Sequence, residues 1–90
     1  MTFYWRGRGL VITWLPVDAM GRLAALAPQT PAEAEVVAAL LAGARVILDR
    51  RGLEYRRYRA TAPMGIYRRC VSLERRLREM GICVAGTGGR

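Results

Sequence analysis

Three short, mostly apolar runs most constrain the fold of this chain. They are LVITWL (10–15), RVIL (45–48) and ICVA (82–85). Continuous runs of this length that are rich in β-branched residues are typical of strands buried on both faces, as in a parallel sheet. Because helical patterns separate the runs, and parallel strands need such crossovers, we expect the three runs to be parallel neighbours in one sheet.

The first crossover is predicted to contain two helices. Residues 18–27 form the first helix, with Asp18 at its N-cap. The second helix begins at TPAE (30–33), where Thr30 is the expected N-cap and Glu33 completes a capping box.

The second crossover is predicted to be one helix, residues 63–80. Its apolar side chains recur at helical spacing along one narrow stripe, which consists of Ile66, Cys70, Leu73, Leu77 and Met80. On the same helix, Glu74 and Arg78 are four residues apart and are expected to form an ion pair.

These elements predict an α/β fold: a small three-layer, half Rossmann-like parallel sheet of about three strands with three helices. The length suits a single domain, 1–90, in which residues 1–8 and 86–90 are expected to be peripheral. Such sheets bind phosphate after the first strand, whereas GRG (7–9) precedes it, so we do not expect GRG to bind phosphate. The aromatic TFYW (2–5) is more apolar surface than a small domain covers, and it is predicted to contact another subunit.

The composition excludes several kinds of chemistry. The chain has no histidine, which excludes histidine acid–base catalysis and histidine-containing triads. Cys70 and Cys83 have no neighbour at metal-ligand spacing; we interpret both as small buried hydrophobic residues and expect no metal. No apolar run approaches the roughly 18 residues of a membrane span, so we expect no membrane partner and a cytoplasmic protein. No catalytic residues are predicted, and an enzyme is not favoured.

The net charge of +8 is concentrated in one segment. All fifteen basic residues are arginines, and residues 50–78 contain ten of them against only Glu54 and Glu74. The other residues carry five arginines and five acids, so their charges balance. Glu54, which lies among arginines, is expected to be ionised in a structural ion pair. An excess of this size favours an anionic partner.

Within that segment, GLEYRRYRATAP (52–63) interleaves arginines with tyrosines. It predicts a partner- or phosphate-binding set that consists of Tyr55, Arg56, Arg57, Tyr58 and Arg59. We expect the tyrosines to pack partly against the domain and the arginines to project outward. One interpretation is a loop that meets an anionic protein or phosphate; the other is nucleic-acid binding by phosphate contacts and base stacking. No known nucleic-acid-binding signature accompanies the charge, so the first interpretation is favoured.

Residues 9–85 resemble the later half of the flavoprotein family of FMN-binding, cysteine-decarboxylase-like proteins. That half has a buried strand, a segment P-x-x-x-N-T-x-A-K-I-A and an alanine-rich helix ending in Gly-Lys-x-Val. The corresponding sequence here, without a gap, is LVITWLPVDAMGRLAALAPQTPAEAEVVAALLAGARVIL. The later GLEYRRYRATAP and LREMGI resemble the tail of flavoprotein-like members associated with bacterial microcompartments for ethanolamine or propanediol use.

The resemblance implies FMN as the cofactor, with Asp18, Ala19 and Arg22 at the positions where the family has Asn, Thr and Lys. The family's phosphate-binding loop belongs to its N-terminal half, so we expect a flavin site here to need a completing chain. The leading hypothesis is a non-catalytic flavoprotein-like module, homo-oligomeric or bound to a protein partner, and accessory to a microcompartment operon. The alternatives are a small basic nucleic-acid-binding protein and a broken gene product without a function of its own.

Overall fold

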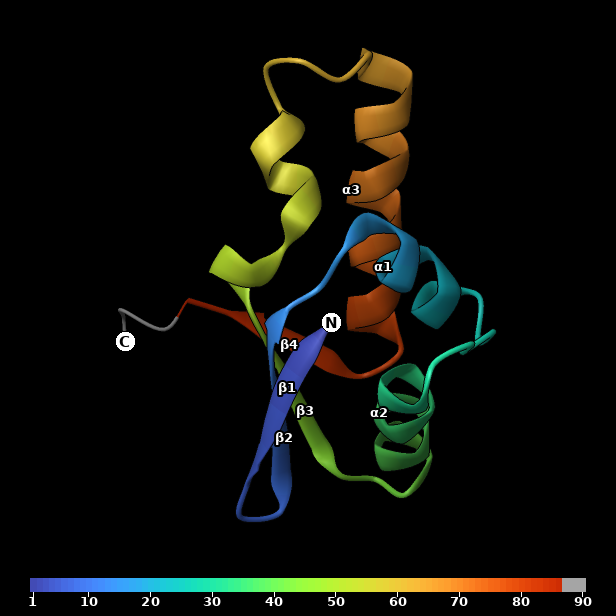
Figure 1. The fold of residues 1–90 in the computed structure, drawn as a ribbon, viewed down its shortest axis with the longest axis vertical. Helices are drawn as coiled ribbons and strands as arrows, with labels where there is room; N and C mark the ends of the chain where they lie inside the picture. Colours follow the sequence, from blue (N-terminus) through green and yellow to red (C-terminus); the bar gives the residue numbers. More distant parts are fainter. Residues whose placement is uncertain (87–90) are drawn as a thin grey trace.

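The computed structural model of the chain describes residues 1–86, which form a four-stranded sheet and three α-helices (Figure 1). The elements follow in the order β1 (Thr2–Arg6), β2 (Gly9–Trp14), α1 (Val17–Ala24), α2 (Pro31–Leu41), β3 (Arg45–Asp49), the short 3-10 helices η1 (Arg50–Gly52) and η2 (Glu54–Tyr58), α3 (Met64–Glu79) and β4 (Ile82–Ala85). No described helix is long and apolar enough to cross a membrane.

The strands lie in the order β1-β2-β3-β4. β3 pairs in parallel with β2 on one side and with β4 on the other, so the three apolar runs are parallel neighbours as predicted. The predicted α/β fold, consistent with a half Rossmann-like unit, is therefore confirmed.

The N-terminal strand is an element that the sequence reading does not include. Residues 1–8 are expected to be peripheral, whereas Thr2–Arg6 form β1, an edge strand that pairs antiparallel with β2. The two strands are joined by a tight turn in which Gly7 has a φ of 62°, a left-handed conformation that suits glycine. The expectation for residues 86–90 falls mostly outside the described part of the chain.

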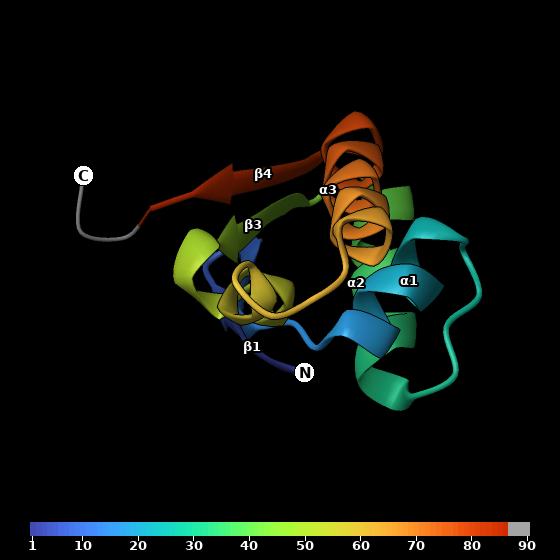
Figure 2. The ribbon, with the colours of Figure 1, turned by 90° about the horizontal axis from the view of Figure 1, so that it is seen from above.

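All three α-helices lie on one face of the sheet (Figure 2). Parallel crossovers are nearly always right-handed, and the strand order runs in one direction from β2 to β4, so both crossovers place their helices on the same side. Three layers would need a reversal of the strand order, and the described sheet has none. The molecule thus differs from the expected arrangement in having two layers and one sheet face without helices, which we call the open face.

The core lies between the sheet and the helices. Alternate residues of the parallel strands point into it: Leu10, Ile12, Val46, Leu48, Ile82 and Val84. From the helices, Met20, Leu23, Val36 and Leu77 meet them. The predicted stripe of α3 is buried at Cys70 and Leu77, but Ile66 is exposed because the N-terminal turns of α3 extend beyond the sheet (Figure 1).

The helix starts confirm one predicted cap and correct another. Thr30 accepts a hydrogen bond from the backbone N–H of Glu33 at 3.1 Å, as the capping box predicts. Asp18 is not the N-cap of α1, because the helix begins one residue earlier and Pro16 takes that position. The carboxylate of Glu54 accepts a hydrogen bond from Val17 N–H at 2.8 Å, so a distant segment caps α1.

Candidate functional site

Strand pairing arranges the side chains of the open face in rows that cross the sheet. Residues directly opposite on neighbouring strands point to the same face. The register therefore places Tyr4, Val11, Ile47 and Cys83 side by side, one from each strand. We call these four residues the apolar row. Tyr4 is 48% exposed, Ile47 is half-buried and Cys83 is exposed, whereas Val11 is buried. The row is therefore accessible at Tyr4, Ile47 and Cys83 only.

A second row lies two residues nearer the start of the parallel strands. Gly9 of β2 is opposite Arg6 of β1 on one side and Arg45 of β3 on the other. Because Gly9 has no side chain, the two arginines flank a gap. Arg8 lies in the turn before Gly9 and extends toward α2, whereas Arg6 and Arg45 belong to the open face. We call Arg6, Arg8 and Arg45 together the basic row.

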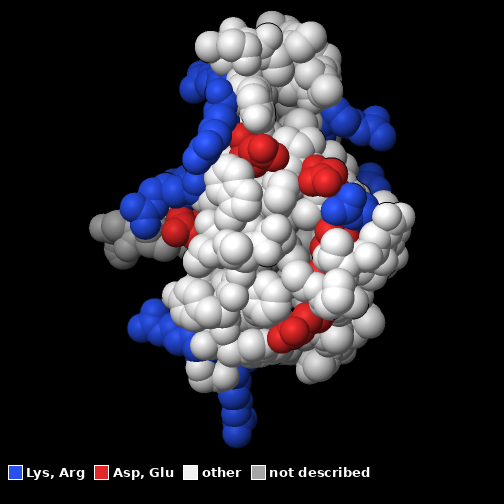
Figure 3. All heavy atoms as spheres, in the orientation of Figure 1, with Lys and Arg blue, Asp and Glu red and all other residues white. Residues whose placement is uncertain are grey.

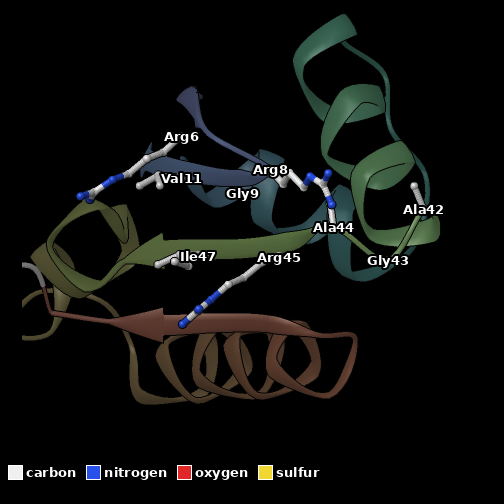
Figure 4. Close-up of a pocket in the computed structure, with 9 residues that line it drawn as sticks. All are labelled: Arg6, Arg8, Gly9, Val11, Ala42, Gly43, Ala44, Arg45 and Ile47. Carbon is white, nitrogen blue, oxygen red and sulfur yellow. The ribbon is translucent and has the colours of Figure 1, made fainter.

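The two rows border a hollow of about 720 Å³. It is lined by Arg6, Arg8, Gly9, Val11, Ala42, Gly43, Ala44, Arg45 and Ile47. Figure 4 shows that the three arginines diverge from its floor. Arg6 extends toward the carboxyl ends of the strands, Arg8 toward α2, and Arg45 across β4.

The arginines of the basic row are not neutralised by the described residues. No ion pair among residues 1–86 involves Arg6, Arg8 or Arg45. The nearest carboxylate of the face by strand position, that of Asp49, pairs with Arg51. Figure 3 shows basic side chains projecting on the left beside the 3-10 segment and at the bottom near the β1–β2 turn, and others on the right margin.

The segment 52–63 turns out to be largely structural. Tyr55 is buried and donates a hydrogen bond to Glu74 of α3. Arg56 and Arg78 also donate to that carboxylate, at 3.0 and 2.9 Å, so the expected pair of Glu74 with Arg78 forms as part of a larger network. This network fastens η2 to α3.

Electrostatics within that network favour charged Glu74 and neutral Tyr55. Burial alone would raise the pKa of Glu74, but hydrogen bonds from Tyr55, Arg78 and Arg56 outweigh it and hold the pKa below its ordinary value. Burial, together with the bond to Glu74, raises the pKa of Tyr55 to about 12. Neither group is therefore poised to exchange a proton near neutral pH.

The remaining residues of the predicted set differ in their surroundings. The guanidinium of Arg57 lies over the ring of Trp14, 4.7 Å from its centroid. Tyr58 is 45% exposed, and Arg59 is exposed. Of the three arginines, Arg56 and Arg57 are thus held by the domain, and Arg59 projects outward as expected.

The residues that the resemblance assigns to FMN lie at the start and middle of α1. Ala19 is buried, and Asp18 accepts a hydrogen bond from its N–H. Arg22 donates two hydrogen bonds to the buried carboxylate of Glu33, at 2.7 and 2.5 Å. The bond from Arg22 lowers the pKa of Glu33 to about 2. A flavin phosphate at Arg22 would compete with Glu33, and FMN binding stays a prediction of the resemblance.

The cysteines separate into a buried and an exposed residue. Cys70 is buried as predicted, and burial raises the pKa of its thiol. Cys83 is exposed, which corrects the prediction that it is buried: it points from β4 to the open face, where no helix covers it. Within residues 1–86 no group of three or more metal-ligating side chains could hold an ion.

Sequence reasoning missed the basic row. Charge counting directs attention to residues 50–78, whereas Arg6, Arg8 and Arg45 lie in the part of the chain whose charges balance. Their acidic counterparts, such as Glu33 and Glu35, lie on α2. The available signal was the aromatic TFYWR before Gly-Arg-Gly, a hairpin pattern that would have put Arg6 beside the first parallel strand.

Comparison with protein-family models, curated proteins and solved structures gives no match for this chain. The flavoprotein resemblance and its microcompartment association therefore stay predictions.

Proposed function

We propose that this chain is a non-catalytic binding module whose open face receives an anionic partner. The observation that supports this function most directly is the pairing of the basic row with the apolar row on a sheet face without helices. Parallel strands with continuous apolar runs normally have both faces covered. Here the second cover would come from the partner.

The charge on the open face selects the kind of partner. Arg6 and Arg45 have no carboxylate partner among the described residues. Covering them with an apolar surface would bury unpaired charge, which is unfavourable by several kcal/mol per ion. An anionic surface satisfies the guanidinium groups through charge-assisted hydrogen bonds while its apolar parts cover Tyr4 and Ile47.

Cys83 offers a natural probe of this function. It is exposed within the apolar row, whereas Cys70 is buried in the core, so a thiol reagent should modify Cys83 first. The labelling is carried out in the presence of saturating poly-L-glutamate or a saturating single-stranded oligonucleotide. Polyethylene glycol serves as the neutral control. At least one polyanion should slow the labelling of Cys83 severalfold, as followed by mass spectrometry. If both polyanions bind and leave the labelling rate unchanged, binding occurs elsewhere and the proposed function is wrong.

A further inference from the structure

The open face has a geometry that identifies its partner more closely, provided that the proposed function holds. We propose that the anionic partner is a single-stranded nucleic acid, with its phosphates along the basic row and its bases on the apolar row. The inference rests on the direction of the arginines, the spacing of the two rows and the exposed ring of Tyr4.

The arginines indicate an extended ligand. A site for one compact anion, such as a phosphate ion, needs donors that converge on it. In Figure 4 the side chains of Arg6, Arg8 and Arg45 instead spread apart from the hollow, toward three different parts of the molecule. Successive phosphates of one strand can meet diverging guanidinium groups, each through paired N–H donors.

The spacing of the rows suits a nucleotide. Along β2, Gly9 of the basic row and Val11 of the apolar row are two residues apart, about 7 Å at the rise of a strand. The sugar of a nucleotide can bridge such a separation between a phosphate and its base. Tyr4, 48% exposed at the end of the apolar row, offers a ring on which a base can stack, and half-buried Ile47, on the far side of the buried Val11, gives a second apolar contact.

Two other partners fit the face less well. A duplex keeps its bases inside, so the apolar row would lie against sugars and phosphates and gain no stacking. An acidic peptide could pair with the arginines, but its carboxylates give Tyr4 no planar partner. These two partners are the alternatives that the experiment must separate.

The experiment measures binding by fluorescence anisotropy at about 150 mM salt, where long-range attraction is screened beyond about 8 Å. Three labelled probes are nucleic acids of about 10 nucleotides, within the range that single-strand-binding surfaces cover: oligo-dT, oligo-U and a duplex of mixed sequence. The fourth probe is labelled poly-L-glutamate. The test protein is the full chain with Arg6→Ala, Arg8→Ala and Arg45→Ala combined. Its matched control combines Arg68→Ala, Arg69→Ala and Arg76→Ala on α3, which removes the same charge from the helical layer.

Two further variants keep the charge. Tyr4→Val removes the ring but preserves strand propensity, and Gly9→Val places a side chain between Arg6 and Arg45 without removing either. Circular dichroism and the thermal midpoint of each variant establish that it is folded before its affinity is compared. If the triple variant does not fold, Gly9→Val provides the alternative test of the basic row.

We expect oligo-dT or oligo-U to bind at least tenfold more tightly than the duplex and poly-L-glutamate. The open-face triple variant should lose this binding at least tenfold, and the slope of log K against log salt should decrease by about 2 for three lost phosphate contacts. The α3 control should change affinity less than threefold. Tyr4→Val should lower the affinity for the single strands at least about fivefold, because the stacking of one base is lost. Its affinity for poly-L-glutamate should not change.

The contrary outcomes separate the two proposals. If poly-L-glutamate or the duplex binds best, and through the basic row, the single-strand inference is wrong while the proposed anion-binding face stands. If Tyr4→Val binds the single strands as well as the native chain does, the stacking arrangement is wrong. If the α3 control loses as much affinity as the open-face variant, binding depends on overall charge, and both proposals fail.

Discussion

Arg6 and Arg45 lie on opposite sides of Gly9 in a single row of the open face, although they belong to different strands. The antiparallel pairing of β1 and the parallel pairing of β3 both place an arginine next to the same glycine. A side chain at that position would fill the space between them. The absence of one leaves the hollow, from which the side chains of Arg6 and Arg45 extend in different directions.

The first prediction concerns Gly9. A Cβ placed there would be 3.5 Å from Arg45 O and 3.6 Å from Arg6 O, ordinary contact distances, so Gly9→Ala should fold. It should raise the free energy of unfolding by about 0.5–1 kcal/mol, because glycine is unfavourable within a strand. Gly9→Val should fold as well and weaken polyanion binding severalfold. Urea unfolding and anisotropy test both statements; a Gly9→Val variant that is folded and binds normally would contradict the role of the gap.

The second prediction distinguishes two arginines of the 52–63 segment. Arg56 donates hydrogen bonds to the buried carboxylate of Glu74, whereas Arg59 is exposed. Arg56→Ala should therefore lower the free energy of unfolding by about 1–2 kcal/mol, since hydrogen bonds to charged groups are among the stronger ones. Arg59→Ala should change it by less than about 0.5 kcal/mol, as is usual for exposed positions. Equal effects in urea titrations would show that the network with Glu74 does not fasten η2.

The parallel core could be predicted from the sequence because its determinants are local. Apolar runs, the Thr30 cap and the stripe through Cys70 and Leu77 each depend on residues within a few positions of one another. The open face depends also on the register of β3 against β2, which no local pattern specifies. The cap on α1 likewise comes from Glu54, which is distant in sequence from Val17. Contacts of this kind, between segments that are distant in the sequence, could not be predicted from local patterns. The candidate site on the open face consists of such contacts.

The third prediction concerns the loss of stability at low pH through protonation of Glu33. The pKa of Glu33 is about 2 in the folded chain, below its ordinary value of 4.5, chiefly because of the hydrogen bond from Arg22. A carboxyl group with a lowered folded pKa stabilises the fold above its unfolded pKa, and this stability is lost as the pH falls from about 4.5 to 2. At pH 7, Glu33→Gln should be less stable by about 2 kcal/mol, because the buried site loses its charged acceptor.

Thermal midpoints of the native chain and of Glu33→Gln between pH 7 and pH 2 test this prediction. The difference between them should be constant near neutral pH and shrink below about pH 4.5. Glu79→Gln on the exposed face of α3 is the control and should show no such dependence. A difference that stays constant down to pH 2 would exclude the charge of Glu33 as its source.

The fourth prediction concerns Gly52, which packs against the backbone of β2. A Cβ there would lie 2.7 Å from the carbonyl carbon of Thr13, so Gly52→Ala must push η1 away from β2. The hydrogen bond from Leu15 N–H to Gly52 O, 2.7 Å long, would be strained or lost. We expect the free energy of unfolding of Gly52→Ala to be lower by about 1–3 kcal/mol, as in other overpacked sites. Gly65→Ala, with no atom within 4 Å of its added Cβ, is the matched control and should be neutral or stabilising.

The last prediction concerns self-association. The sequence predicts a homo-oligomer or a protein partner, and the open face is where a second copy could pack. The apolar row favours such packing, whereas Arg6 and Arg45 oppose it, because burying them leaves charges without partners. Combining Arg6→Ala with Arg45→Ala should therefore increase dimer formation in sedimentation velocity at micromolar concentration. High salt, which screens the arginines, should shift the native chain in the same direction. If the native chain is already a dimer whose stability does not change with salt, and Cys83 is protected from thiol reagents in it, the open face is an interface between copies, and its proposed partner has no access to it.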